Sequence, residues 1–429
     1  MIHKVIFKLG QALRNPSLND HYDFLLQSDH WTRDELEKYQ LERLKELMTF
    51  AYEHSPFYRK EFEEAGVLPS DVQSLDDLKK LPIIDKKIVA AHADEIKSDA
   101  KFNRLQLSET SGTSGTTLQI YRSEEWDSHN RAAWFRGFSW YGVKPWDRNG
   151  YFWGFNIAPS EQWKTRVLDW LVNRFRVFSY DKDEIAVFVN KLKKGAVYIG
   201  GYSSMIYETA RMVNQMGLSG GFKLKMVKGT SEKIYDHYQD EVKKAFGCKL
   251  ISEYGGCESG MIAFECPCGH MHVVMEHVIV EEVDGEIVVT NLMSKSFPFI
   301  RYKLGDSIQL APDSFRCECG RESQVILDVL GRVGKKVVGK EKTYPSLTFY
   351  YVFKNLGLQK GIALNYQAQQ YEKGKIVLLI EQNQPEYEPL IKEEIKKYFT
   401  DDIDFEIKWG VQIHPVNGKL RDFISHIDN

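Results

Sequence analysis

The chain has 429 residues, 43% of them hydrophobic and 27% charged, which is enough for two or three domains around a substantial core. Its formal net charge of -3 argues against a dedicated nucleic-acid surface, because such surfaces are strongly basic. The longest apolar runs fall short of the ~20 residues that a membrane-spanning helix needs. We therefore expect a globular, cytoplasmic protein with no nucleic-acid partner and no integral membrane segment.

The segment Met1–Pro16 is both basic and apolar. Lys4 and Lys8 interrupt any signal-peptide core, so we interpret this segment as a helix that packs on the body of the protein. A peripheral membrane contact is the alternative. In Leu36–Ala65, apolar residues recur every three or four positions, which predicts helix.

The stretch Leu107–Arg122 is rich in Thr, Ser and Gly, with almost no apolar residues before Leu118. This composition favours a loop whose N–H and hydroxyl groups could hold a phosphate, with Gly112 and Gly115 allowing close approach. A flexible linker is the alternative. The Walker A pattern is not met because no Lys follows Gly115, so a lysine that serves this loop must come from elsewhere in the chain.

Short apolar runs alternate with helical patterns in the middle of the chain. The predicted strands are Phe152–Phe155, Ala196–Gly201, the first half of Leu224–Glu232, and Cys248–Tyr254, and the predicted helices include Glu124–Tyr141, Thr165–Leu171 and Asp183–Leu192. This alternation predicts an α/β fold with a largely parallel sheet. Ligands bind such sheets at the carboxyl ends of strands, where Gly229–Glu232 and Gly255–Glu258 would lie.

The pattern changes after Gly285, where two antiparallel strands, Glu286–Asn291 and Ser307–Ala311, are predicted around the turn-rich Arg301–Asp306. The final residues predict a small α+β unit. Its expected elements are a helix at Pro345–Asn355, a hairpin of Ile362–Gln369 and Lys375–Glu381, a helix at Glu386–Phe399 and a strand at Phe405–Ile413. Because Gly331–Lys336 is charged and contains glycine, we place a domain boundary there, giving domains 1–333 and 334–429.

Four of the six cysteines form two matched C-x-C-G turns, at 266–269 and 317–320. Soft ligands at this spacing suit tetrahedral zinc, whereas a disulfide is disfavoured in a reducing compartment. A site so rich in thiolates has no obvious open position, so we predict a structural zinc held by knuckles at 266–272 and 317–319. The predicted ligands are Cys266, Cys317 and Cys319, with either Cys268 or His272 as the fourth.

Taken together, the motifs resemble the phenylacetate–CoA ligase and CapK-type branch of the adenylate-forming (acyl-CoA synthetase-like) superfamily. The resemblance extends over nearly the whole chain and depends on the number and order of its motifs. These are Arg43–Val67, Leu81–Lys86, Thr110–Thr117, Lys228–Glu232, Glu253–Gly260, Phe264–Cys266, Pro298–Asp306, Cys317–Arg321, Gly331–Arg332 and Asn417–Lys419. It implies a large α/β domain, 1–333, that binds ATP and a carboxylate, and a small mobile lid domain, 334–429.

Members of this family use ATP to convert a carboxylate into an acyl-adenylate, then pass the acyl group to a nucleophile, usually the thiol of CoA. The resemblance implies that Glu258 holds Mg²⁺, a hard cation that prefers oxygen ligands, and that Tyr254 stacks on adenine. It further implies that Asp306 binds the ribose hydroxyls, while Arg332 lies near the ribose and phosphate. The remaining implied nucleotide contacts are Thr110, Ser111, Gly112, Thr113, Ser114, Gly115, Thr116, Thr117, Gly229, Thr230, Ser231, Glu232, Gly255 and Gly256.

The resemblance also supplies the lysine that the phosphate loop lacks. Lys419 would neutralise charge at the α-phosphate and carboxylate, although without the family it could be only a turn lysine. The lid would rotate about a hinge near Gly334–Lys335, where most relatives carry an Asp, and this departure bears on the thioester step rather than on adenylation. Relatives also usually carry Thr or Ser where Cys257 stands, and often a Lys where Leu118–Gln119 stands.

The acyl pocket implied by the resemblance is lined by Trp134 on the aromatic helix, with Gly201, Tyr202 and Ser203 opposite. The expected reaction is ATP- and Mg²⁺-dependent carboxylate activation with CoA as acceptor, and the resemblance implies a homodimer. A second hypothesis is a polysaccharide-biosynthesis enzyme that transfers an adenylated acid or amino acid to a sugar amine or hydroxyl. A third is a zinc-bearing nucleotide-binding protein without catalysis.

Overall fold

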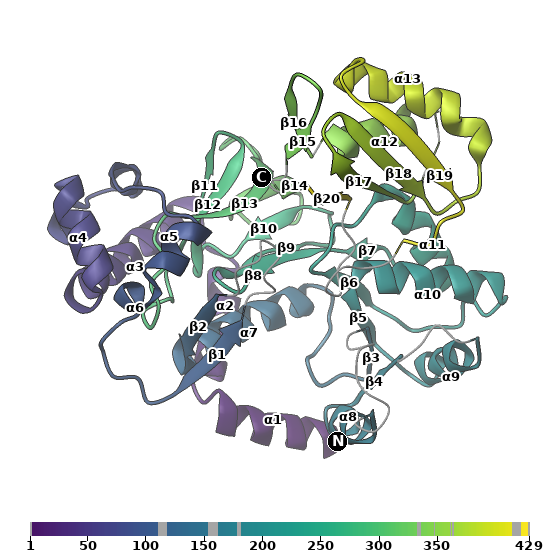
Figure 1. Ribbon diagram of the computed structural model, residues 1–429. Coiled ribbons are helices and arrows are strands. Elements are labelled where there is room, and N and C mark those ends of the chain that lie inside the picture. Colours follow the sequence, from purple (N-terminus) through teal and green to yellow (C-terminus); the bar gives the residue numbers. More distant parts are fainter. Residues whose placement is uncertain are drawn as a thin grey trace. The chain divides into compact units, whose positions relative to one another are not determined.

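The computed structural model describes residues 2–109, 118–152, 162–177, 182–332, 336–346, 348–360, 362, 364–413 and 422–427. The chain divides into two compact units (Figure 1). The first unit contains Met1–Leu304 and Gln309–Asp328, and the second contains Gly305–Ile308 and Val329–Asn429. The expected domain division after residue 333 stays a prediction.

The first unit begins with helices. They are α1 (Ile2–Arg14), α2 (Leu18–Ser28), α3 (Arg33–His54), α4 (Pro56–Ala65), α5 (Lys86–Ala91) and α6 (Ala93–Ile96), with short 3₁₀ turns at Pro69–Asp71 and Leu75–Lys80. The helix predicted over 36–65 is two helices, because Ser55 ends α3, caps α4 with its side chain, and is followed by Pro56 at the first helical position. Gly66, at φ 65°, ends α4 in the left-handed conformation.

An antiparallel hairpin and a long helix follow. Strands β1 (Leu105–Glu109) and β2 (Gln119–Ser123) pair so that Glu109 lies opposite Gln119. The Thr/Ser-rich segment connects these two strands in the sequence. Helix α7 (Glu124–Trp140) begins where the Ser123 side chain accepts a hydrogen bond from the Trp126 backbone N–H. The predicted helix over 124–141 is confirmed.

A parallel sheet of five strands forms the predicted α/β core, in the order β4-β3-β5-β6-β7. Its elements are β3 (Asn149–Phe152), α8 (Gln162–Leu171), β4 (Arg174–Arg176), α9 (Lys182–Lys193), β5 (Tyr198–Tyr202), α10 (Ser203–Gln215), β6 (Met226–Thr230), α11 (Asp236–Phe246) and β7 (Leu250–Ile251). Helices α9, α10 and α11 contact these strands, and their apolar faces share one buried cluster that includes Ile199 and Val227. The largely parallel sheet is confirmed.

A second sheet of the unit is antiparallel, and two predictions within it were wrong. The run Cys248–Tyr254 is not one strand: β7 ends the parallel sheet at Ile251, and β8 (Glu253–Gly256) belongs to a seven-stranded sheet of order β11-β12-β13-β14-β10-β9-β8. The segment predicted as turns, Arg301–Asp306, runs into a strand from Tyr302 onward, and that strand continues through Gly305 although its φ is 78°. The other strands are β9 (Gly260–Glu265), β10 (Met271–Val273), β11 (Val278–Val283), β12 (Glu286–Asn291), β13 (Tyr302–Leu310) and β14 (Val325–Arg332).

The second unit has its own buried core, which includes Phe349, Leu378 and Phe399. Its sheet has the order β19-β18-β17-β20, and the predicted hairpin is present with Gln367 opposite Leu379. The elements are β15 (Lys336–Val338), β16 (Thr343–Pro345), α12 (Thr348–Lys360), β17 (Tyr366–Glu372), β18 (Lys375–Ile380), α13 (Glu388–Phe399), β19 (Asp404–Trp409) and β20 (Phe423–Ser425), with a 3₁₀ turn at Pro385–Tyr387. Among the helices described in either unit, none is both long enough and apolar enough to cross a bilayer.

Candidate functional site

Two glycines lie side by side at the carboxyl ends of β5 and β6. Gly201 pairs in register with Gly229, and both belong to segments that the sequence placed near the ligand. A Cβ on Gly201 would come within 2.3 Å of the Phe152 carbonyl oxygen, and one on Gly229 within 2.4 Å of the Ser203 hydroxyl. Side chains are therefore excluded at both positions, because the Phe152 carbonyl and the Ser203 hydroxyl already occupy that space.

The segment after β6 is held against the start of α10. Ser203, the first residue of α10, donates its hydroxyl to the backbone carbonyl of Glu232 at 3.2 Å. Ser231 has a positive φ of 64°, which is uncommon for a residue with a side chain. Predicted site residues Ser203, Gly229, Ser231 and Glu232 thus belong to one local structure.

A buried ion pair joins β6 to the start of β8. Nζ of Lys228 lies 2.7 Å from Oε1 of Glu253, and both side chains are about nine-tenths buried. Oε2 of Glu253 is also buried and has no hydrogen-bond partner among the described residues. The pair fixes two of the family motifs, Lys228–Glu232 and Glu253–Gly260, relative to each other, and it leaves one buried acceptor oxygen.

Glu258 lies in a short loop between β8 and β9 whose carbonyl groups are held from several sides. The Asn291 amide donates to the carbonyls of both Glu258 and Ser259 at 3.1 Å, and the Arg122 guanidinium donates to the carbonyl of Cys257 at 2.8 Å. Just beyond the loop, the side-chain oxygen of Asn130 accepts the backbone N–H of Met261 at 2.6 Å. Because Arg122 lies on β2, this contact also ties the hairpin that carries the Thr/Ser-rich segment to the Glu258 loop.

Two buried histidines complete this support, and their contacts determine their protonation. Nε2 of His277 lies 3.0 Å from the carbonyl oxygen of Ser259, so that nitrogen must carry the proton. Nδ1 of His277 then accepts, and Nδ1 of His129, 3.0 Å away, donates. Burial lowers the pKa of His277 to about 3, and burial likewise lowers the pKa of His129 well below its usual range. Both rings are therefore neutral at physiological pH.

The Glu258 carboxylate itself is half-buried and is oriented by a neighbouring strand. The Tyr302 hydroxyl, on β13, donates to Oε1 of Glu258 at 3.3 Å. Tyr254 is also half-buried on β8, and Gly255 and Gly256 that follow it are exposed. A Cβ on Gly255 would come within 2.3 Å of the Gly260 carbonyl oxygen, so glycine is required for the close β8–β9 approach.

Helix α7 contributes more to the core than to an open pocket. Trp126 is fully buried and packs edge-on against Phe299, with ring centroids 6.4 Å apart. Trp134 is half-buried and lies against a cluster that includes Ala132 and Phe264. Trp126 therefore belongs to the core, while the substrate role of Trp134 stays a prediction.

Several predicted site residues lie outside the described residues. Thr110, Ser111, Gly112, Thr113, Ser114, Gly115, Thr116 and Thr117 are among them, together with the hinge Gly334–Lys335 and Lys419. Asp306 lies on β13, within the short segment that groups with the second unit, and the backbone of Arg332 ends β14. Their roles, which come from the family resemblance, stay predictions.

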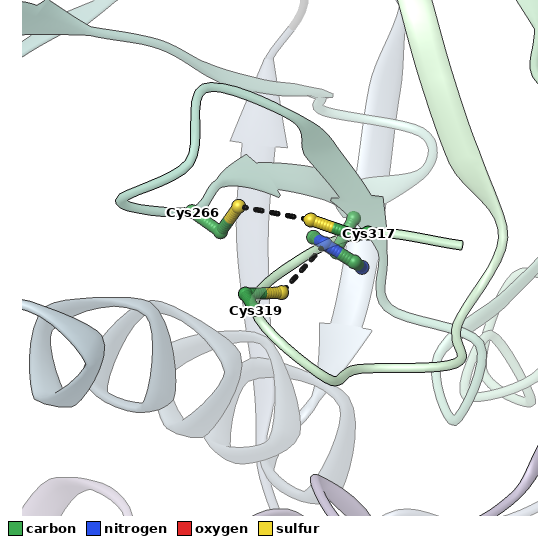
Figure 2. A group of neighbouring side chains, drawn as sticks. Cys266, Cys317 and Cys319 are labelled. Carbon is green, nitrogen blue, oxygen red and sulfur yellow. Dashed lines mark hydrogen bonds between the residues drawn. The ribbon is translucent and has the colours of Figure 1, made fainter. Parts of the chain in front are cut away.

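A cluster of four soft ligand atoms joins the two predicted knuckles. Sγ of Cys266, Cys317 and Cys319 and a ring nitrogen of His272 all lie within 4.8 Å of one another. Figure 2 shows Cys266 and Cys317 pointing their sulfur atoms toward each other, 3.7 Å apart. Tetrahedral zinc with Zn–S bonds of about 2.3 Å requires sulfur atoms about 3.8 Å apart. Cys268 is exposed and is not part of this cluster.

The surroundings of the cluster also suit a metal. Nδ1 of His272 lies 2.9 Å from the Ser323 hydroxyl, leaving Nε2, 3.2 Å from Sγ of Cys319, to face the cluster. Burial raises the pKa of the Cys266 thiol and raises that of Cys317 to about 12, so a bound cation would have to displace those protons. Of the two candidates for the fourth ligand, His272 is the one that lies in the cluster.

Sequence reasoning missed most of the residues that support Glu258. Asn130, His277 and Asn291 come from three separate segments and carry no short pattern of their own, and Tyr302 lies in the motif Pro298–Asp306 without having been assigned a role. In the sequence, Arg122 stands out only as the last residue of the Thr/Ser-rich stretch. The available signal was polarity within apolar surroundings: His277 and Asn291 are isolated polar residues at the ends of two runs of valine and isoleucine.

Sequence comparison with known proteins bears on the predicted resemblance. No protein-family model matches the chain. CapK of Staphylococcus aureus is 23% identical over 290 residues, which are 65% of this chain and 64% of CapK. The phenylacetate-coenzyme A ligase of Thermus thermophilus is 24% identical over 344 residues, 71% of this chain and 72% of that protein. The predicted resemblance is confirmed.

The solved structures agree on the fold. 2-Hydroxyisobutyryl-CoA ligase, in the postadenylation state in complex with R3-HIB-AMP, superimposes with a TM-score of 0.71 over 93% of this chain and 91% of that chain, at 17% identity. In its open conformation, in complex with 2-HIB-AMP and CoA, the same ligase gives a TM-score of 0.62. The chain therefore has the mixed α/β fold of the adenylate-forming enzymes, and its relatives support the predicted class, AMP-forming ligases.

Proposed function

We propose that the chain is an ATP-dependent, adenylate-forming ligase that activates a carboxylic acid and transfers its acyl group to CoA. In the first step a carboxylate oxygen bonds to the α-phosphorus of ATP and pyrophosphate leaves. In the second, the CoA sulfur bonds to the acyl carbon, AMP leaves, and the thiol proton is released. The observation that carries the proposal is the loop of Glu258, whose backbone is fixed by Asn291, His277 and Arg122 and which follows the exposed Gly255 and Gly256.

The nucleotide would bind at the carboxyl ends of β6 and β8. Gly229, Thr230, Ser231 and Glu232 would form one wall, and Tyr254 with Gly255 and Gly256 the other. The Lys228–Glu253 pair supports this proposal because it sets the spacing of the two walls with a buried contact that solvent does not screen. Asp306 would accept the ribose hydroxyls and Arg332 would approach the phosphates, while Thr110–Thr117 would hold the β- and γ-phosphates.

Glu258 is the residue that we assign to Mg²⁺. Its carboxylate is a hard oxygen ligand, and the hydrogen bond from Tyr302 to Oε1 orients the side chain without neutralising it. Mg²⁺ would supply charge that offsets the phosphate oxygens as pyrophosphate leaves. Lys419 would act on the same charge from the small domain, and this is why both residues are assigned catalytic roles.

The four-ligand cluster of Cys266, His272, Cys317 and Cys319 would hold a structural zinc. Three thiolates and one imidazole complete a tetrahedral site, leaving no position for substrate, so the metal would join the two knuckles rather than take part in the reaction. The domain layout 1–333 and 334–429 and a cytoplasmic location belong to the same proposal.

A second function is favoured by one comparison, the match to CapK over 65% of this chain. Under this alternative the acyl adenylate forms in the same way, but the acceptor is a sugar amine or hydroxyl in surface-polysaccharide biosynthesis. The departure of Gly334–Lys335 from the hinge residues of most relatives is the sequence feature that agrees with it. The third hypothesis, nucleotide binding without catalysis, predicts no pyrophosphate chemistry with any acid.

Isotope exchange between ATP and pyrophosphate, followed by AMP release, tests these functions. Exchange that depends on one class among aryl, fatty, amino and sugar acids supports adenylation and identifies the substrate class. AMP release that requires CoA supports the thioester reaction, whereas release that requires an amino sugar and ignores CoA supports the polysaccharide alternative.

A further inference from the structure

Half of the large apolar side chains that are exposed among the described residues lie on just two helices, α1 and α8. The two helices contact each other in the first unit, and Figure 1 shows them side by side. We call the set of these side chains the α1–α8 surface. It consists of Ile2, Val5, Leu9, Leu13, Trp163, Val167, Leu168 and Trp170, which are between 50% and 81% exposed.

Helix α1 is oriented with its apolar stripe away from the protein. Phe7 contacts Phe135 and Trp146, and Nζ of Lys4 and of Lys8 lie 5.3 and 5.8 Å from the centre of the Trp146 ring. The side of the helix that faces the body therefore includes its lysines. Ile2, Val5, Leu9 and Leu13, spaced by three and four residues, form the stripe on the other side. A surface helix of a globular protein normally has the opposite orientation.

Helix α8 extends this stripe with two tryptophans. The ring of Trp170 packs edge-on against His3 of α1 at 5.3 Å, and Nδ1 of His3 lies 3.4 Å from the carbonyl oxygen of Leu171. Trp163 and Trp170 are nevertheless 62% and 56% exposed. Tryptophan is the side chain that most favours the boundary between water and lipid, because its ring is apolar and its N–H is polar.

The exposed charged side chains of the two helices are all basic. Helix α1 contains no acidic residue and α8 contains one, Asp169, which is buried and paired with Arg176 at 2.6 Å. Lys4 and Lys8 are exposed on the side of α1 toward Trp146, and Lys164 is exposed next to Trp163 on α8. This local positive charge contrasts with the net charge of -3 for the whole chain.

We propose that the α1–α8 surface docks on a membrane whose headgroups are anionic. Apolar side chains and tryptophans would enter the interface while the lysine ammonium groups remain at the level of the lipid phosphates. A second copy of the chain fits this surface less well, because a two-fold interface would bring like-charged lysines together, and neither α1 nor α8 has an exposed acidic residue to offset them. The proposal does not depend on the proposed ligase activity.

Co-sedimentation of the full chain with phospholipid vesicles tests the proposal. We expect binding to vesicles that contain phosphatidylglycerol, weaker binding to pure phosphatidylcholine, and weaker binding at high salt. The variant L9Q/L13Q removes two exposed leucines and should reduce vesicle binding by about tenfold. The matched control is L68Q/I88Q, which changes two apolar side chains of 43% and 36% exposure elsewhere and should bind as the wild type does.

Folding and self-association are measured on the same samples. Equal thermal midpoints for wild type and L9Q/L13Q exclude unfolding as the cause of lost binding. The proposal is overturned if the wild type ignores anionic vesicles or if L9Q/L13Q binds them as well as the wild type. It is also overturned if the wild type is a dimer that L9Q/L13Q dissociates, since the surface would then belong to a second copy.

Discussion

His277 supports Glu258 through the backbone: its Nε2–H lies 3.0 Å from the carbonyl oxygen of Ser259, the residue that follows Glu258. Nδ1 of His277 accepts a hydrogen bond from Nδ1 of His129, so Nδ1 of His277 must be unprotonated and the ring must be neutral. Protonation of the pair would place two like charges in contact within a buried region. The support of the Glu258 loop is therefore tied to the proton affinity of two histidines.

This relationship predicts how stability depends on pH. Burial lowers the pKa of His277 to about 3, whereas in the unfolded chain its pKa is about 6.5. Between these two pH values the unfolded chain binds a proton at this residue and the folded chain does not. Stability should fall as pH decreases from about 6.5 toward 3, by up to about 1.4 kcal/mol per pH unit for this residue. In H277Q, where the amide can still donate to Ser259, urea unfolding should show a shallower decline between pH 7 and pH 5.

The control for this experiment is H30Q, which removes a histidine at an exposed position. We expect H30Q to follow the wild type. If H277Q and the wild type lose stability in parallel as the pH falls, His277 does not carry the acid sensitivity.

The Lys228–Glu253 pair predicts a large and non-additive stability effect. K228M would leave the Glu253 carboxylate buried without its partner, at a cost of about 3–5 kcal/mol in the free energy of unfolding. The double variant K228M/E253Q should recover a substantial part of that loss, because no uncompensated charge remains. Denaturant unfolding of the single and double variants measures the coupling.

An exposed pair provides the comparison. Lys60 and Glu64 lie on α4 with side chains about two-thirds exposed, and K60M should change stability by no more than about 0.5 kcal/mol. Similar losses for K228M and K60M would mean that the pair at the site contributes little to the fold.

The Cys/His cluster predicts which cysteines hold the metal. C317S/C319S should release one zinc per chain and lower the thermal midpoint, because sites of this kind can gain on the order of 10 kcal/mol from zinc binding. C268S is the matched control, since Cys268 lies in the same knuckle but outside the cluster. Zinc content by mass spectrometry should be unchanged in C268S. Loss of zinc from C268S together with its retention in H272A would assign the fourth ligand to Cys268.

Lys419 can be tested although it lies outside the described residues. K419A should slow acyl-adenylate formation by about a hundredfold or more while ATP affinity changes little, because the lysine is expected to act on charge that develops during the reaction. K373A, which changes an exposed lysine of the same unit, is the control. Unchanged adenylation in K419A would remove this lysine from the site.

Local patterns predicted much of the fold and located the site loops, and their failures have physical causes. The parallel sheet followed from alternating apolar runs, and both C-x-C-G turns lie where the cluster forms. The run 248–254 misled because one continuous apolar pattern serves two sheets, with the change at Ser252. Whether Cys268 or His272 joins the cluster depends on how β9 and β10 reverse the chain, which spacing alone does not determine.

Local patterns could not predict the residues that hold the Glu258 loop, for a different reason. His277 and Asn291 are separated from Glu258 by 18 residues or more, and each contributes one hydrogen bond or a pair of them from a different strand end. Only the three-dimensional pairing of β11 and β12 with the rest of the sheet brings them to the loop. Helix α1 shows the same limit, since the sequence predicted a helix that packs on the body but not that its apolar side would face outward.

The most direct test of the proposed function is acid-dependent ATP–pyrophosphate exchange in the wild type, E258Q and E64Q. The account predicts exchange with one class of acid in the wild type and in E64Q, which changes an exposed carboxylate on α4. In E258Q, exchange should fall by about a hundredfold or more and should respond less to added Mg²⁺. Exchange in E258Q equal to the wild type would contradict the role of Glu258. Absence of exchange in the folded wild type with aryl, fatty, amino and sugar acids alike would contradict adenylation itself.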